Sequence, residues 1–128
     1  ERVNEMTVDQ SCAAAIVYST CPDAQTARDI GRALVVAKLA ACVNILPGMT
    51  SIYQWDGGVS TDDEVVMIIK TRKALVEKVI AEASAQHPYD TPAFLALDVV
   101  VGAPAYLSWI MSETLAPAGD DPLKTDVS

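Results

Sequence analysis

The segment 64–70, EVVMIIK, limits the fold of this chain because it is apolar on both sides. Successive side chains of a strand point to opposite faces of the sheet. Val65, Met67 and Ile69 would therefore face one way and Val66 and Ile68 the other. Residues 95–101 are apolar on both sides in the same manner. A sheet built from such strands needs cover on both of its faces.

Strand and helix patterns alternate along the chain in a simple order. Apolar runs rich in β-branched residues indicate strands, and apolar positions three and four residues apart indicate helices. The expected elements are a strand at 13–19, a helix at 24–41, a strand at 42–46 that continues at 51–55, a strand at 64–70, a helix from 72 to 87, a strand at 94–101 and a last short helix from 104.

Local signals support these boundaries. Cys21-Pro22-Asp23 is typical of a helix start, with proline near the first turn. Pro47-Gly48 predicts a bend in a long strand, and Asp56-Gly57-Gly58 predicts a hairpin turn. Thr71 is the expected N-cap of the second helix. That helix carries a stripe of Val76, Ile80 and Ala83 and should end where His87 meets Pro88.

The order β-α-β-β-α-β predicts an α+β fold. We expect a ferredoxin-like split βαβ sandwich, in which both helices pack on one face of a four-stranded antiparallel sheet, with an additional C-terminal helix. This arrangement leaves the second sheet face open, although its strands are apolar there. Because monomers rarely leave large apolar patches in water, we expect the chain to associate with copies of itself.

Length and composition predict one domain. The chain has 128 residues, 51% of them hydrophobic, which is enough for one core. We expect that domain at 13–115, with flexible tails at 1–12 and 116–128. Residues 1–12 and 113–128 together carry five of the eight net negative charges. Nucleic-acid binders need a basic surface, so we expect no nucleic-acid partner and interpret the acidic tails as aids to solubility.

Nothing in the sequence predicts a membrane segment or an export signal. No apolar run reaches the roughly 18 residues that a membrane-spanning helix needs, and residues 1–12 lack the pattern of a signal peptide. We therefore expect a cytoplasmic protein with no membrane contact. Cys12, Cys21 and Cys42 are an odd number for a disulfide framework. We expect them to be reduced thiols.

The sequence contains, in order, KLAACVNILPG at 38–48, SIYQW at 51–55, Glu64 with IKT at 69–71, and HPYDTP at 87–92. These four motifs resemble the CutA divalent-cation tolerance family. Together with the segment 106–110, the resemblance covers roughly residues 14–112. The resemblance implies a ferredoxin-like subunit assembled as a tight homotrimer, similar in architecture to PII-type signal proteins, with long strands that run across subunit boundaries.

The resemblance also implies a role in tolerance of divalent metals, copper above all, and brings no established catalytic reaction with it. We expect a trimer that binds Cu²⁺ or another divalent cation, with no required cofactor and no identified protein partner. The animal members' role in anchoring acetylcholinesterase is not carried over, because this sequence shows no exporting or anchoring segment.

Cys42 and His87 are the predicted metal ligands. Thiolate and imidazole suit copper or zinc, and His87 is the single histidine of the chain. Zinc sites take three or four protein ligands at recognisable spacings, and the cysteines show no such pattern. Any metal would have to be held by residues that converge in space or between subunits. The alternatives are that Cys42 is a small buried side chain and that the His87 ring bonds locally.

Five residues are predicted to line a cleft between subunits, namely Tyr53, Trp55, Glu64, Lys70 and Tyr89. Tyr53 and Trp55 share one strand face, where packing is the simpler alternative to ligand stacking. Glu64 and Lys70 also share a face, yet lie too far apart on one strand to pair with each other. Solvent exposure at the strand ends is their simpler alternative.

Cys21 lies ahead of the first helix. There the helix dipole could lower the pKa of the thiol and make it reactive, and the alternative is an inert side chain.

Two functions from different classes remain open. The first is metal binding in a tolerance role. The second is a PII-like trimeric signalling module that binds a small ligand in clefts between subunits, and a third possibility is a rigid scaffold. The sequence has no phosphate-binding glycine loop and no nucleophile elbow, so we expect no enzymatic activity.

Overall fold

The computed structural model describes residues 14–116. The predicted N-terminal tail and almost all of the predicted C-terminal tail lie outside these residues. In chain order the elements are β1 (Ala14–Cys21), α2 (Ala24–Val36), β2 (Cys42–Trp55), β3 (Gly58–Arg72), the 3-10 turn η2 (Lys73–Leu75), α3 (Val76–Gln86), β4 (Phe94–Asp98) and α4 (Pro104–Ser112).

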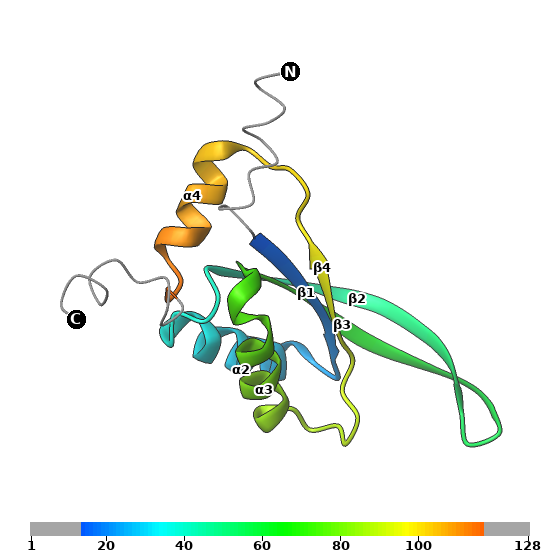
Figure 1. Ribbon diagram of the computed structural model, residues 1–128. Coiled ribbons are helices and arrows are strands. Elements are labelled where there is room, and N and C mark those ends of the chain that lie inside the picture. The colour runs from blue at the N-terminus through cyan, green and yellow to red at the C-terminus, as the bar shows by residue number, and fades with distance from the viewer. Residues whose placement is uncertain (1–13, 117–128) are drawn as a thin grey trace.

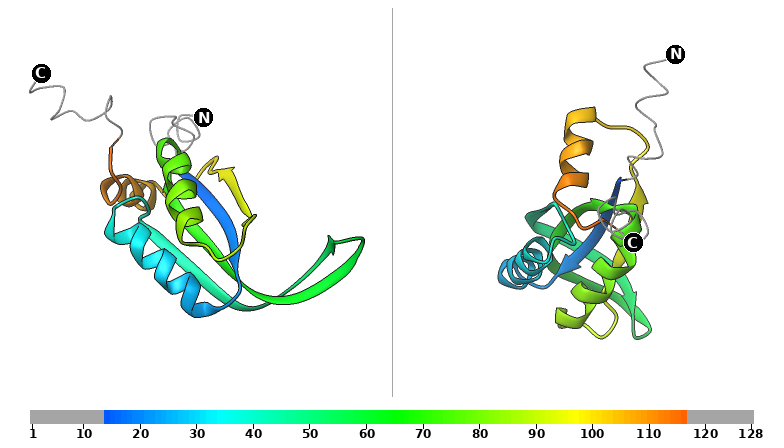
Figure 2. Two further views of the ribbon diagram at one scale, coloured as in Figure 1. Left: turned by 90° about the horizontal axis from the view of Figure 1, so that it is seen from below. Right: turned by 60° about the vertical axis from the view of Figure 1, so that its left-hand side comes forward.

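The four strands form one antiparallel sheet in the order β2-β3-β1-β4. Helices α2 and α3 lie side by side on one face of this sheet, and α4 lies at one end of it (Figures 1 and 2). A mixed α+β fold with both of these helices on one face was predicted and is confirmed. The β2–β3 hairpin extends beyond β1 and β4 as a two-stranded arm.

The core lies between the sheet and the two helices. Alternation brings Val17, Val65, Met67 and Ile69 to the helix-facing side of the sheet, where they are buried. Helix α2 packs against them with a stripe that holds Ala27, Ile30 and Leu34, and α3 adds Val79 and Ala83. The spacings of three and four residues keep each stripe on one helix face.

Helix α2 begins as predicted and ends five residues earlier than predicted. Asp23 is the N-cap, and its side chain accepts a hydrogen bond from the Thr26 backbone N–H at 2.8 Å. At the other end Lys38 adopts the left-handed conformation, with a φ of 60°, which stops the helix. Ala41 already donates its backbone N–H to Lys70 and so starts the β2 ladder instead of a further helical turn.

Thr71 was expected to cap the second helix, and this prediction is wrong. Thr71 is still part of β3, fully buried, and its hydroxyl donates to the Leu39 carbonyl at 2.6 Å. The helix layer begins instead with η2, whose N-cap Arg72 makes no side-chain cap bond. Helix α3 ends at Gln86, and His87 is extended, as expected of a residue before proline.

A single β2 strand replaces the two predicted pieces. Leu46 pairs with Val66 and Met49 with Glu64, so β2 contains one residue more than β3 between these pairs. This β-bulge falls at Pro47-Gly48, where Gly48 has a φ of 85°. At the tip, Asp56 and Gly57 both have positive φ, as a two-residue type I′ hairpin turn requires. The hairpin prediction is therefore confirmed.

The last strand is shorter than the predicted 94–101. Strand β4 pairs only with β1. The pairing begins with Phe94 opposite Ser19 and ends with Asp98 opposite Ala15, and Val99 then donates its backbone N–H to the Ala14 carbonyl. The following residues lead into α4 without a strand partner. Arg72 fixes the end of α4, because its guanidinium donates to Thr114 Oγ1 at 3.0 Å and to the Thr114 carbonyl at 3.1 Å.

The sheet face away from α2 and α3 is apolar, and among residues 14–116 only α4 covers part of it, at the end where Ala14 and Arg72 lie. Leu46, Leu95 and Leu97 on this face are 48, 63 and 56% exposed. Their neighbours across the strands include Ile16, Tyr18, Val66 and Ile68. We call this surface the open face. Within the same described part of the chain, no helix is both long and apolar enough to cross a membrane.

The two faces of α2 should differ sharply in their sensitivity to truncation. Leu34 is fully buried and Val36 is 73% exposed. Leu34→Ala should reduce the free energy of unfolding by about 2–5 kcal/mol, because it leaves a cavity in the core. Val36→Ala should change it by less than about 0.5 kcal/mol. Urea unfolding of both variants at one protein concentration checks this, and equal losses would contradict the assigned helix orientation.

Candidate functional site

Most of the residues that were predicted for a cleft lie on the open face. On β3, Glu64 and Lys70 alternate onto this face together with Val66 and Ile68. On β2, Cys42 lies opposite Lys70 and points the same way. The extra residue of the bulge shifts the alternation of β2, so Tyr53 and Trp55 stay on this face as well.

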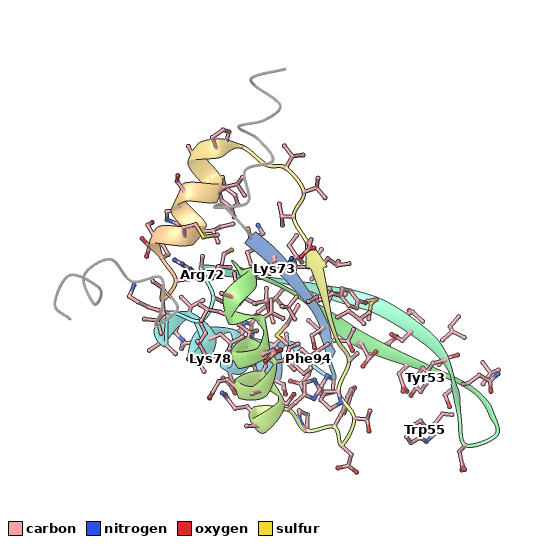
Figure 3. The ribbon with its side chains drawn as sticks, viewed as in Figure 1. Tyr53, Trp55, Arg72, Lys73, Lys78 and Phe94 are labelled. Atoms are coloured by element: carbon pink, nitrogen blue, oxygen red, sulfur yellow. The ribbon has the colours of Figure 1, made fainter. Side chains whose placement is uncertain are left out.

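These residues do not form one site within a subunit, because they are spread along the sheet. Glu64 and Lys70 are six residues apart on β3. This separation corresponds to about 20 Å along a strand. Trp55 is at the far end of the arm and is 67% exposed. Figure 3 shows Tyr53 and Trp55 on the projecting hairpin, away from Phe94 and the helices.

Lys70 belongs to an aromatic group at the α4 end of the sheet. Its ammonium donates to the Tyr106 hydroxyl at 3.1 Å and lies 5.3 Å from the centre of the Tyr106 ring. The Tyr106 ring stacks on Trp109 with 5.5 Å between ring centroids. This arrangement holds the positive charge of Lys70 over an aromatic surface, beside the thiol of Cys42.

Glu64 is the centre of a second group, at the base of the arm. Its carboxylate accepts hydrogen bonds from Ser51 Oγ at 2.7 Å and from the Tyr89 hydroxyl at 2.9 Å. Further out along the arm, the Tyr53 hydroxyl donates to Asp62. The loop after α3 is thereby tied to the arm through Tyr89.

The tyrosine hydroxyls in this second group hold their protons strongly. Desolvation, the hydrogen bond to Glu64 and the negative charge of Glu64 raise the pKa of Tyr89 to about 12. The hydrogen bond to Asp62 likewise raises the pKa of Tyr53. Both hydroxyls therefore keep their protons at neutral pH. They act as hydrogen-bond donors to carboxylates and not as bases.

His87 lies on the helix side of the sheet, and both of its ring nitrogens have partners. Nε2 lies 2.8 Å from the Thr20 carbonyl, and Nδ1 accepts the Tyr89 backbone N–H at 3.2 Å. Towards a carbonyl Nε2 can only donate, so these contacts fix the neutral tautomer with the proton on Nε2. The arrangement matches the alternative of a locally bonded ring, and a metal could bind only after one of these bonds is broken.

Cys21 is the cysteine that lies beside His87. Its sulfur is fully buried, 3.8 Å from His87 Nε2. Burial, with smaller contributions from the charges of Asp23 and Glu64, raises the pKa of the Cys21 thiol to about 11. The idea that the start of α2 lowers this pKa is wrong, because burial of the thiol raises it. Cys21 is a protonated thiol in the core, as the alternative interpretation stated.

Cys42 and His87 are far apart within one subunit. Cys42 pairs with Lys70 near one end of β3, and Cys21, beside His87, pairs with Val65. Five residues of strand correspond to about 17 Å, and the two side chains also lie on opposite faces. Among residues 14–116, no three His, Cys, Asp or Glu side chains gather as a metal would require.

Sequence patterns could not reveal two features of this site. The approach of Cys21 to His87 depends on how the loop after α3 folds back to β1, which no periodicity encodes. The partners of Glu64 and Tyr53, namely Ser51 and Asp62, become visible only when the register of the hairpin is known. The sequence signals for that register were the turn at Asp56-Gly57 and the bulge at Pro47-Gly48.

Comparison with protein families gives a match over almost all of the described residues. The model of the family described as CutA1 divalent ion tolerance protein matches residues 15–113. The chain is similar to the protein "Divalent-cation tolerance protein CutA" of Thermus thermophilus, with 42% identity over 77% of this chain and 96% of that protein.

A chloroplastic CutA protein of Arabidopsis thaliana is 41% identical over 77% of this chain. The chain matches only 54% of the length of that relative. A crystal structure of CutA from Xylella fastidiosa superimposes with a TM-score of 0.78 at 43% identity, and the match covers 80% of this chain and 98% of that structure.

Removing the acceptor of Tyr89 should change its titration. In Glu64→Gln the pKa of Tyr89 should fall from about 12 towards 10, and remain above 10 because desolvation is its largest cause. Ultraviolet absorbance of tyrosinate during a pH titration measures this, with Tyr89→Phe to assign the signal. Asp62→Asn is the matched control and should act mainly on Tyr53. A Tyr89 titration that is unchanged in Glu64→Gln would contradict the hydrogen bond.

Proposed function

The chain belongs to the CutA1 divalent ion tolerance family, and on this basis we propose that it acts in copper tolerance as a homotrimer that binds the cation directly. The observation that carries the proposal is the family match over residues 15–113, which spans both groups of the open face. Metal tolerance is the function named for the family and for its relatives. Copper, the trimer and direct binding are the parts that we add.

The trimer is supported by the surface that a single subunit leaves exposed. On the arm, Trp55 is 67% exposed on the open face, and Ile52 and Val59 are 71 and 67% exposed on the opposite side. A two-stranded ribbon is only marginally stable in water, and large apolar patches are rare on monomers. We propose that the subunit is a ferredoxin-like unit and that three copies close a ring in which open faces and arms cover one another.

Direct copper binding is supported by the position of Cys42. A thiolate is a soft ligand that suits copper, and Cys42 lies half-buried on the surface that the trimer would enclose. His87 cannot join Cys42 within one subunit, because they are on opposite faces of the sheet. We therefore propose that the cation is held between subunits, where Cys42 of one copy meets donors of another copy. His87 can bind the cation only if its ring breaks the hydrogen bond to the Thr20 carbonyl or the one from the Tyr89 backbone N–H.

A catalytic role is not part of the proposal. The names of the family and its relatives describe tolerance proteins and not enzymes. The buried thiol of Cys21 is protonated at neutral pH, and His87 is engaged on both nitrogens. This pair therefore lacks the thiolate that a cysteine nucleophile requires.

Charges on the open face should break the trimer. Light scattering of the unmodified chain should give three times the subunit mass of 13.6 kDa. Leu95→Lys/Leu97→Lys should shift the mass towards a single copy, because desolvating these ammonium groups in an interface is costly. Lys78→Glu, a charge change on exposed α3 (Figure 3), should leave the trimer intact. A single-copy mass for the unmodified chain would overturn the trimer.

Copper uptake should depend on Cys42 more than on His87. Native mass spectrometry of the metal-stripped protein should show stoichiometric Cu²⁺ binding, and Cys42→Ser should weaken it by at least about tenfold. His87→Ala should have the smaller effect, because its nitrogens bond within the subunit. If the double variant Cys42→Ser/His87→Ala bound Cu²⁺ as well as the unmodified chain, the copper site would be overturned. Saturable binding of a nucleotide that needs neither residue would favour the signalling module instead.

A further inference from the structure

A groove runs along the outer side of α2, at the edge of the sheet formed by β2. It has a volume of about 500 Å³. Its floor is close-packed, since a Cβ atom at Gly31 would lie 3.2 Å from Val43 Cγ1. Figure 2 shows α2 lying along this side of the sheet. The residues that give the groove its chemical character are Arg28, Arg32, Val35, Val36, Val43 and Ile45.

Charged and apolar side chains occupy different ends of this groove. Val35 and Val36, at the C-terminal end of α2, are 41 and 73% exposed. Arg28 and Arg32 follow towards the N-terminal end, one helical turn apart. Neither guanidinium bonds to another residue of 14–116. The one carboxylate in the groove, Asp29, accepts a hydrogen bond from Gln25 at 2.9 Å.

The described chain ends beside the apolar end of the groove. Leu115 donates its backbone N–H to the Lys38 carbonyl at 2.9 Å, two residues beyond the last residue of α2. Glu113 also lies 3.8 Å from the Lys38 ammonium. Twelve further residues follow Ala116, and they include Asp120, Asp121 and Asp126 against the single base Lys124.

We propose that this groove binds the C-terminal segment 117–128 of the chain itself. The order of residues in the segment fits the order in the groove. Pro117 and Ala118 would pass Val36 and Val35 first, and Asp120 and Asp121 would then reach the two arginines.

The lengths agree as well. Asp120 is four residues from Ala116, an extended reach of about 14 Å. Arg32 and Arg28 are six and ten residues before Lys38, which corresponds to about 9 and 15 Å along a helix axis. Pro117 and Pro122 favour an extended backbone for the residues around them, which suits a segment laid along a helix. Arginine forks bind carboxylates in bidentate geometry.

Nuclear magnetic resonance of the full-length chain tests this docking. At low salt, heteronuclear relaxation of 118–122 should match that of α2, and methyl contacts should connect Ala118 with Val35 and Val36. Arg28→Gln/Arg32→Gln should abolish both signals, as should Asp120→Asn/Asp121→Asn. Salt at about 1 M should weaken them, because screening is then effective within about 3 Å.

Lys78→Gln is the matched control, since it removes an exposed positive charge from α3 and should leave the signals intact. Relaxation typical of an unstructured peptide at 118–122 in the unmodified chain would overturn the proposal. Signals that persist in both double variants would overturn it too. The proposal would also be refuted if the methyl contacts of Val35 and Val36 came from a second copy of the chain while 118–122 remained unstructured.

Discussion

The fold depends on β3, the longest strand, because one of its faces packs in the core and the other contributes to the open face. Over residues 66–70 it pairs with both β1 and β2, and there its helix-facing residues lie in the core. Over residues 58–64 it pairs with β2 alone, so this part of the strand has no other strand of the described residues beside it. A strand that is apolar on both sides thus produces both the stable body and the unfilled open face.

The bulge at Pro47-Gly48 determines which residues the open face presents. Without its extra residue, Tyr53 and Trp55 would point to the opposite side of the arm from Glu64, because side chains alternate with a period of two. Pro47 is tolerated because β2 is an edge strand of the sheet within a subunit. A short irregular segment therefore sets the chemistry of the sheet surface that lies beyond it along β2.

Much of the fold followed from the sequence, because periodicity and turn chemistry act locally. Asp23, Asp56 and Gly57 marked a helix start and a hairpin turn, and the family resemblance of the motifs at 38–48 and 87–92 is confirmed. The predictions that were wrong concern properties that depend on contacts between distant parts of the chain. Thr71 remained in a strand because Leu39 supplies an acceptor for its hydroxyl. Cys21 gained a raised pKa from burial that its place in the sequence could not reveal.

The pairing of β2 with β3 also bears on the order in which the chain folds. The hairpin closes through a two-residue turn, so its strands meet at little cost in loop entropy. Strand β1 instead pairs only with β3 and β4, both of which follow it after long intervening segments. Contacts between distant segments slow folding. The arm, which is the least covered part of the finished subunit, is thus the part whose partners are nearest in the growing chain.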